Sequence, residues 1–233
     1  MQTEPGSYHI NPERMLSDFS NLSQIGSSGD GGVHRPSLTA ADLQARAWFA
    51  ERAREAGLAY QMDAAGNQTA RLACGPAGAP SFLIGSHLDS VPYGGRFDGA
   101  LGVAAALEVL RVIREQGISL PVNLEAVNFT DEEGTLMGLM GSRAMTGALN
   151  AEALAHPKSG RAALEERFQA AGLDLARVLD AARPAGSVSG YLELHGAQGQ
   201  WLEQANLPIG IVSGMPVACG YRLSFRGRAD HSG

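Results

Sequence analysis

SFLIGSHLDSVPYGGRFDG at residues 81–99 and VNLEAVNFTDEEG at residues 122–134 are the two stretches that decide the fold. Each begins with a short apolar run, which is typical of a strand buried on both faces of a sheet. Between the two runs, residues 99–116 carry apolar side chains at helical spacing, and Gly117 follows as a stop signal. A strand, a helix and a strand in this order predict a βαβ unit, whose parallel strands end at the same edge of the sheet.

The rest of the chain extends this pattern in both directions. Residues 37–57 predict a helix that is capped by Thr39 and ended by Gly57. Further elements are expected as strands at 58–62, 68–72 and 191–194 and as one or two surface helices at 161–182. The sequence therefore predicts an α/β fold, a mostly parallel sheet flanked by helices.

The hydrophobic pattern of the predicted strands changes late in the chain, which predicts a domain boundary there. From Val217 to Phe225, apolar side chains alternate with polar or small ones, which indicates a strand with one buried and one solvent-exposed face. We therefore expect a first domain at residues 1–212 and the beginning of a second, smaller α+β domain at residues 213–233.

Composition and charge narrow the classes of function. The chain has 233 residues, 44% of them hydrophobic, and a formal net charge of -6 without any Lys/Arg-rich run. Nucleic acids and anionic membranes attract concentrated positive charge, so we expect neither as a partner and expect a small-molecule substrate instead. Residues 1–15 are polar and lack the apolar core of a secretory signal, which predicts a cytoplasmic protein.

Polar side chains follow the predicted strands at the points where the strands end. His87 and Asp89 follow the first apolar run, Asp98 opens the long helix, and the pair at 132–133 follows the second run, while His195 follows a third strand. In open α/β sheets, ligands bind in the crevice beyond the carboxyl ends of the strands. Two imidazoles and several carboxylates gathered there would suit two divalent cations such as zinc, manganese or cobalt.

Charge gives a physical reason to expect metal ions at this edge. Carboxylates brought together would repel each other, and their pKa values would rise unless cations neutralised them. Asp98 could bridge two ions, one of Glu132 and Glu133 could bind metal, and the other could carry the proton of an attacking water. Asp89 could accept the second imidazole N–H of His87 and fix its tautomer.

Each of these residues also has an ordinary structural explanation. A lone histidine at a strand end is usually a hydrogen-bonded structural residue, an aspartate at a helix start is usually a cap, and a pair of glutamates after a strand is usually solvated loop. Their joint placement after successive strands, among several glycines, favours the metal site.

The motifs resemble the dinuclear M20-type metallohydrolases. The resemblance rests on GSHLDSVP (85–92), GRFDG (95–99), FTDEEG (129–134) and GSRAM (141–145). More narrowly, LH (194–195), QG (198–199) and ADHSG (229–233) resemble the branch that hydrolyses N-carbamoyl-L-amino acids and allantoate. The resemblance implies a zinc-peptidase-like catalytic domain, a smaller dimerisation domain and a homodimer when full length.

The resemblance also implies roles for individual residues. His87, Asp98 and His195 would hold one metal ion, and Asp98 would bridge to a second ion that Glu133 also binds. The two divalent ions would be zinc, manganese, cobalt or nickel. Glu132 would be the general acid and base of a reaction in which metal-bound hydroxide attacks the ureido carbonyl and releases ammonia and carbon dioxide.

Two further residues are implied as substrate ligands, Gln198 and His231. Peptidase relatives generally have a carboxylate where this chain has His195, whereas the carbamoyl branch has histidine. An aminoacylase or peptidase on the same scaffold is the alternative within enzymes.

The sequence departs from the family pattern in two places. Ala197 stands beside Gln198 where relatives usually have an acidic residue, which puts substrate choice there in doubt. Relatives continue well past the motif around His231 and supply a further histidine ligand, whereas this chain stops at Gly233. We therefore expect a truncated chain whose site is one ligand short, and a catalytically inactive fragment is the second alternative.

Overall fold

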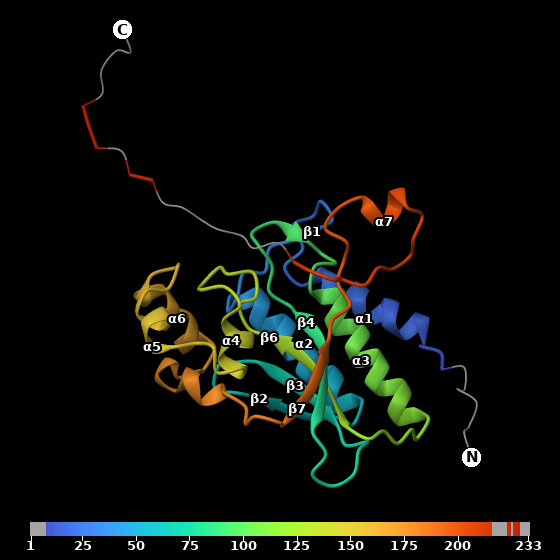
Figure 1. Ribbon diagram of the computed structural model, residues 1–233. Helices are drawn as coiled ribbons and strands as arrows, with labels where there is room; N and C mark the ends of the chain where they lie inside the picture. Colours follow the sequence, from blue (N-terminus) through green and yellow to red (C-terminus); the bar gives the residue numbers. More distant parts are fainter. Residues whose placement is uncertain (1–7, 216–222, 225, 229–233) are drawn as a thin grey trace. The chain divides into compact units, whose positions relative to one another are not determined.

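The computed structural model describes residues 8–215, 223–224 and 226–228, which divide into two compact units, one ending at Gly196 and one beginning at Ala197. A five-stranded sheet forms the centre of the first unit (Figure 1). Its order is β2 (Ala59–Met62), β3 (Gln68–Leu72), β6 (Asn123–Phe129), β4 (Ser81–His87) and β7 (Val188–Leu192). The α/β fold predicted from the sequence is confirmed.

The sheet is mixed, with its parallel strands on the side that carries the polar motifs. β4 pairs in parallel with β6 and with β7, whereas β2 and β3 form an antiparallel hairpin and β3 runs antiparallel to β6. A side chain at Gly85 would meet the carbonyl oxygen of Val127 at 2.1 Å, so glycine allows β4 to approach β6 this closely. The parallel strands bring their carboxyl ends to one edge, as the βαβ prediction requires.

Helices cover both faces of the sheet. α1 (Pro12–Gln24), α2 (Ala40–Glu55) and α3 (Ala100–Glu115) contribute to the largest hydrophobic core together with Ala126 of β6. The next residue of β6, Val127, points to the opposite face and packs with Met145 of α4 (Met140–Met145). A third cluster joins α4 to α5 (Ala151–Ala155), α6 (Arg161–Ala170) and the 3-10 helix η1 (Leu175–Ala181).

The predicted helix boundaries have the expected physical causes. The Thr39 hydroxyl accepts the backbone N–H of Asp42 at 3.4 Å as the N-cap of α2, and Gly57 ends the helix region at a φ of +65°. α1, which the sequence did not predict, begins with Asn11 accepting the N–H of Arg14 at 2.9 Å.

A two-stranded ladder joins two loops that are far apart in sequence. β1 (Gly32–Val33) pairs antiparallel with β5 (Gly94–Gly95), so that Gly32 faces Gly95 and Val33 faces Gly94. The ring of His34 lies 4.7 Å from the ring of Tyr93 beside this ladder. The loop that leads to Asp98 is therefore paired to the segment that precedes α2.

The second unit contains the short helix α7 (Trp201–Gln204). The division falls between Gly196 and Ala197, earlier than the predicted boundary after residue 212. Most of the alternating stretch at 217–225 and all of 229–233 lie outside the described residues, so the second-domain assignment stays a prediction. None of the described helices combines the length and the apolar character that crossing a bilayer would require.

Candidate metal centre

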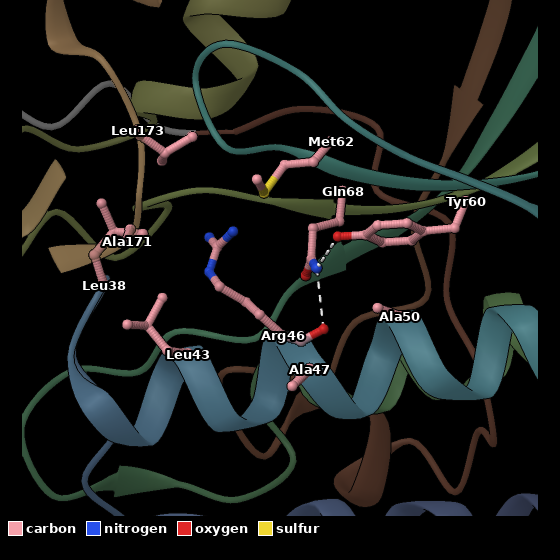
Figure 2. A pocket seen from close by; sticks show the side chains of 10 residues that line it. All are labelled: Leu38, Leu43, Arg46, Ala47, Ala50, Tyr60, Met62, Gln68, Ala171 and Leu173. Atoms are coloured by element: carbon pink, nitrogen blue, oxygen red, sulfur yellow. Dashed lines mark hydrogen bonds between the residues drawn. The ribbon is translucent and has the colours of Figure 1, made fainter. Parts of the chain in front are cut away.

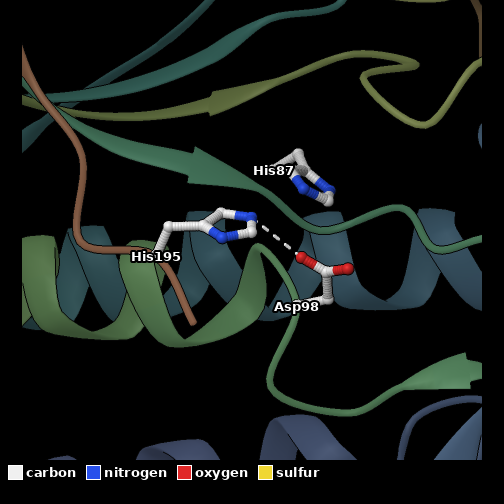
Figure 3. Close-up of side chains that lie close together, drawn as sticks. All are labelled: His87, Asp98 and His195. Atoms are coloured by element: carbon white, nitrogen blue, oxygen red, sulfur yellow. Dashed lines mark ion pairs between the residues drawn. The ribbon is translucent and has the colours of Figure 1, made fainter. Parts of the chain in front are cut away.

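Three of the predicted ligands come together at the carboxyl edge of the sheet. One ligand atom each of His87, Asp98 and His195 lie within 4.8 Å of one another (Figure 3). His87 ends β4, Asp98 lies in the loop before α3, and His195 follows β7. The Nε2 atom of His195 is 2.9 Å from Oδ1 of Asp98. The two parallel strands thus deliver the two imidazoles to one place.

His87 is held rigidly. Its side chain is 2% exposed, and its Nδ1 atom lies 2.9 Å from the backbone carbonyl oxygen of Asp89. Because a carbonyl only accepts, this contact assigns an N–H to Nδ1, so that in the neutral ring Nε2 keeps its lone pair, 3.5 Å from Oε2 of Glu132. The sequence prediction gave this contact to the Asp89 carboxylate, whose oxygen is 3.8 Å from Nδ1.

A glycine makes room for the His87 ring. Gly99 has a φ of +62°, and a side chain there would lie 2.5 Å from Cε1 of His87. The backbone between Asp98 and α3 therefore passes directly against the imidazole. Only glycine combines this left-handed conformation with such a close approach.

The Asp89 carboxylate joins the ends of two strands. It is buried, and its two oxygens accept the backbone N–H groups of Glu132 and Glu133, each at 3.3 Å. Burial raises the pKa of Asp89 to about 7, an effect that His87 opposes and Asp42 reinforces. Burial alone would lower the pKa of His87, but the Asp89 and Glu132 carboxylates outweigh it and the net shift is upward.

The two predicted glutamates lie at the edge of this group. Glu132 is beside His87, and its side chain is 36% exposed. Oε1 of Glu133 accepts the backbone N–H of Val91 at 3.4 Å, and Glu133 is not among the three residues whose ligand atoms converge. Burial raises the pKa of Glu133, as do Asp98 and Glu132, while His87 lowers it. Cations would relieve this crowding of carboxylates.

Asp131 organises the loop that presents the glutamates. It has a φ of +54° and is fully buried. Its carboxylate accepts four hydrogen bonds, from the Thr135 hydroxyl at 3.2 Å and from the backbone N–H groups of Leu136, Met137 and Gly138 at 2.9, 2.6 and 3.0 Å. The sequence predicted no role for Asp131, which appears only within the FTDEEG motif at 129–134. Its position between a buried strand and a glycine-containing loop was the available signal.

A buried arginine supports the opposite side of the His87 loop, and the sequence analysis missed it. Arg35 is 1% exposed and has no carboxylate hydrogen-bonded to it among the described residues. Its guanidinium donates to the carbonyl oxygens of Leu88 at 2.5 Å, Leu22 at 3.1 Å and Ile25 at 2.9 Å. Burial lowers its pKa, against the attraction of Asp42 and Asp89. Arg35 thereby ties the end of α1 to the loop after His87.

His195 has a more open environment. Its side chain is 34% exposed, and Nδ1 lies 2.9 Å from the carbonyl oxygen of Gly196. Two residues earlier, the Glu193 carboxylate accepts hydrogen bonds from the hydroxyls of Ser86 and Tyr191. Burial and Glu193 raise the pKa of Tyr191. The sequence did not single out Glu193 either. The available signal was spacing, because Tyr191, Glu193 and His195 are two positions apart, as side chains on one face of a strand are.

The two residues predicted to bind substrate are not part of the group described above. Gln198 is an exposed residue of the second unit, and His231 lies outside the described residues. Their roles stay predictions.

A separate cavity of about 180 Å³ lies between α2 and the β2–β3 hairpin (Figure 2). Arg46 projects into it and donates to Asp42, to the Gly66 carbonyl and to the Thr130 hydroxyl. The Gln68 amide donates to the Arg46 carbonyl and to the hydroxyl of Tyr60. None of the predicted site residues lines this cavity, whose polar side chains are bonded to the protein itself.

The donor set fits a divalent transition-metal ion. Two imidazole nitrogens and a carboxylate are ligands that zinc, manganese, cobalt and nickel accept, and the Asp98 and His195 side chains remain about one-third exposed, so an ion can reach them.

Comparisons with known proteins show which family model, relatives and solved structures the chain matches. Residues 83–230 match the model of peptidase family M20/M25/M40. The chain is 43% identical over 226 residues to an N-carbamoyl-L-amino acid amidohydrolase of Geobacillus stearothermophilus, covering 96% of this chain and 55% of that protein. It is 36% identical over 228 residues to an N-carbamoyl-L-amino-acid amidohydrolase of Pseudomonas sp. (strain NS671), again covering 96% and 55%.

A solved structure, a hydantoinase/carbamoylase family amidase from Burkholderia ambifaria, superposes with a TM-score of 0.75 at 37% identity, covering 85% of this chain and 48% of that one. The chain thus spans about half the length of the relatives it matches.

Proposed function

The chain belongs to peptidase family M20/M25/M40, and from this membership we propose that it carries the metal-binding part of an amidohydrolase acting on ureido C–N bonds. The proposed substrates are N-carbamoyl-L-amino acids or allantoate. Two observations support these substrates. The relatives reported above are named as N-carbamoyl-L-amino acid amidohydrolases. In addition, this chain has His195 at the position where the family resemblance implies a carboxylate in peptidases.

The observation that carries the proposal is the convergence of His87, Asp98 and His195 within 4.8 Å. These three would hold one divalent ion, and Asp98 with Glu133 would hold a second. When bound, such ions polarise a carbonyl and lower the pKa of a water molecule. Their identity is proposed as zinc, manganese, cobalt or nickel.

Proton transfer is proposed to depend on Glu132 and on the residue that positions it. Glu132 is 3.5 Å from Nε2 of His87 and is partly exposed, so it can reach a water at the site, take its proton and deliver that proton to the leaving nitrogen. The backbone N–H of Glu132 is held by Asp89, which limits the movement of this base. Hydrolysis of a carbamoyl group would give the free amino acid, carbon dioxide and ammonia.

Substrate recognition is proposed to involve Gln198 and His231, within a homodimer in the cytoplasm. These assignments rest on motif resemblance. They are tested by substitution in a version of the chain extended to the length of its relatives.

Glu132→Gln tests the proposed function most directly. In the extended version, we expect turnover of an N-carbamoyl-amino acid to fall by roughly 10³-fold or more, with the metal content per chain unchanged. Retained turnover would remove Glu132 as the base. Glu166→Gln, at an exposed position on α6, is the matched control and should leave turnover unchanged.

Comparing products decides between ureido and amide substrates. Ammonia released from N-carbamoyl-amino acids should exceed amine released from N-acyl-amino acids in the extended version. The reverse result would identify an aminoacylase or peptidase. Elemental analysis of the 233-residue chain completes the test, because two tightly bound metal ions per chain would rule out the inactive fragment.

A further inference from the structure

The segment that carries His195 lies beyond the backbone pairing of its own strand. The β4–β7 ladder ends at the pair Ile84 and Leu192, whereas the β4–β6 ladder continues through His87, which faces Phe129. His87 is therefore held by strand pairing, and His195 is not. Other contacts must set the position of the His195 ring relative to Asp98.

One such contact is a close approach to α3. A side chain at Gly102 would lie 2.6 Å from the carbonyl oxygen of Leu194, so the backbone just before His195 packs directly on the helix. This contact limits how far the segment can move toward α3. It sets no limit in the direction along the edge of β4.

The Glu193 side chain supplies a contact in that direction. One carboxylate oxygen accepts the hydroxyl of Ser86, the residue before His87, and the other accepts the hydroxyl of Tyr191 at 2.8 Å. The Tyr191 hydroxyl also lies 3.1 Å from the Gly85 carbonyl oxygen, and its ring packs edge-on against Phe129 at 5.7 Å. Glu193 thus bridges the end of β4 to the His195 segment where the backbone ladder has stopped.

Hydrogen bonds from hydroxyls to a carboxylate are shorter and stronger than those between neutral groups, and they fix the direction of the side chain. Groups that orient a metal ligand without touching the metal affect metal affinity by about 10–100-fold when they are removed.

We propose that Glu193 is a positioning residue that fixes His195 against Asp98 and His87 by clamping the segment after β7 to Ser86. The proposal rests on the metal-binding role of His195 proposed above.

Co²⁺ titration of the 233-residue chain tests the clamp, with the visible absorption of bound Co²⁺ as a second readout. Glu193→Ala should weaken Co²⁺ binding about 10–100-fold and change the absorption spectrum, while urea unfolding shows that the variant is still fully folded under the conditions of the titration. Glu193→Gln should stay within about threefold of wild type, because its amide can accept from Tyr191 and donate to Ser86. Glu166→Ala is the exposed control and should match wild type.

Two outcomes would overturn the proposal. If Glu193→Ala binds Co²⁺ as tightly as wild type, the clamp does not position His195. If Glu193→Gln is as weak as Glu193→Ala, the negative charge acts and the hydrogen-bonded geometry does not.

Absence of Co²⁺ binding in the wild-type chain would count against the proposed metal site and would leave a separate test of the clamp. Crystal structures of the metal-free wild-type and Glu193→Ala chains then decide. Loss of the 2.9 Å contact between His195 and Asp98 in the variant supports the clamp, and its retention refutes it.

Discussion

The two histidines of the candidate site differ sharply in how the protein holds them. His87 is 2% exposed, is paired to β6 through the backbone, and is bonded to the Asp89 carbonyl. His195 is 34% exposed and follows an edge strand whose ladder has already ended. The site therefore has a preorganised half, which folding alone completes, and an open half, which a few side-chain contacts support. Substitutions in the two halves should separate stability from metal binding.

The largest effect should come from filling the space under His87. We expect Gly99→Ala to reduce the free energy of unfolding by roughly 2–5 kcal/mol, because the new methyl group meets the imidazole and the residue keeps a left-handed backbone. Urea unfolding measures the cost. Gly117→Ala is the matched control, with a φ of +61° and no atom within 4 Å of the new methyl, and it should cost about 1–2 kcal/mol. Equal costs would mean that both the His87 ring and the His87 backbone carbonyl, each 2.5 Å from the new methyl group, can move aside.

A smaller loss is expected on cutting the link between the two strand ends. Asp89→Asn leaves one oxygen to accept two backbone N–H groups, so the unfolding free energy should fall by about 2 kcal/mol and metal affinity should fall with it. Asp180→Asn, on the exposed surface of η1, should change stability by less than about 0.5 kcal/mol. Asp89→Asn with unchanged urea stability would show that the loop after β6 does not depend on this carboxylate.

Removing each imidazole in turn contrasts the two halves directly. His87→Ala and His195→Ala should both abolish tight metal binding, measured by titration calorimetry. Only His87→Ala should also destabilise the fold, by about 2 kcal/mol, since the side chain is buried and hydrogen-bonded. His195→Ala should stay within about 0.5 kcal/mol of wild type. A comparable loss of stability in both variants would contradict the division into two halves.

The smallest change should follow Tyr191→Phe. The variant loses the hydroxyl that contacts Glu193 and the Gly85 carbonyl, and we expect a cost of about 0.5–1 kcal/mol in urea unfolding. The clamp from Glu193 to Ser86 remains, so metal affinity should fall less than in Glu193→Ala. A larger loss would make Tyr191 the main support of the open half.

The sequence predicted the preorganised half well. The apolar runs at 81–85 and 122–129 became β4 and β6, and the helical spacing at 99–116 became α3, because burial on both faces of a sheet and on one face of a helix leaves clear periodic patterns. His87 followed from the end of a predicted strand and Asp98 from the start of the predicted long helix. The pairing direction of β3 could not be read, because a hairpin strand and a crossover strand can have the same composition.

The contacts that support the candidate site could not be predicted from the sequence, and the physical reason differs from one contact to the next. β1 and β5 have two residues each, too few to show any alternation. Arg35 is buried although arginine is usually exposed, and the three carbonyl oxygens that accept its hydrogen bonds are apparent in the structure alone. Glu193 acts on a segment more than one hundred positions away, at Ser86, and no local pattern encodes such a contact.

The β1–β5 ladder bears on the order in which the chain folds. Gly32 and Gly95 are separated by about sixty residues. Closing a loop of this length loses conformational entropy, and the few hydrogen bonds between two short strands offset only part of that loss. We expect the ladder to form only after the sheet and α3 have brought the two loops together. We expect the Asp98 loop to be the last part of the first unit to gain protection from hydrogen exchange and the first to lose it, so the candidate metal site would be completed late in folding.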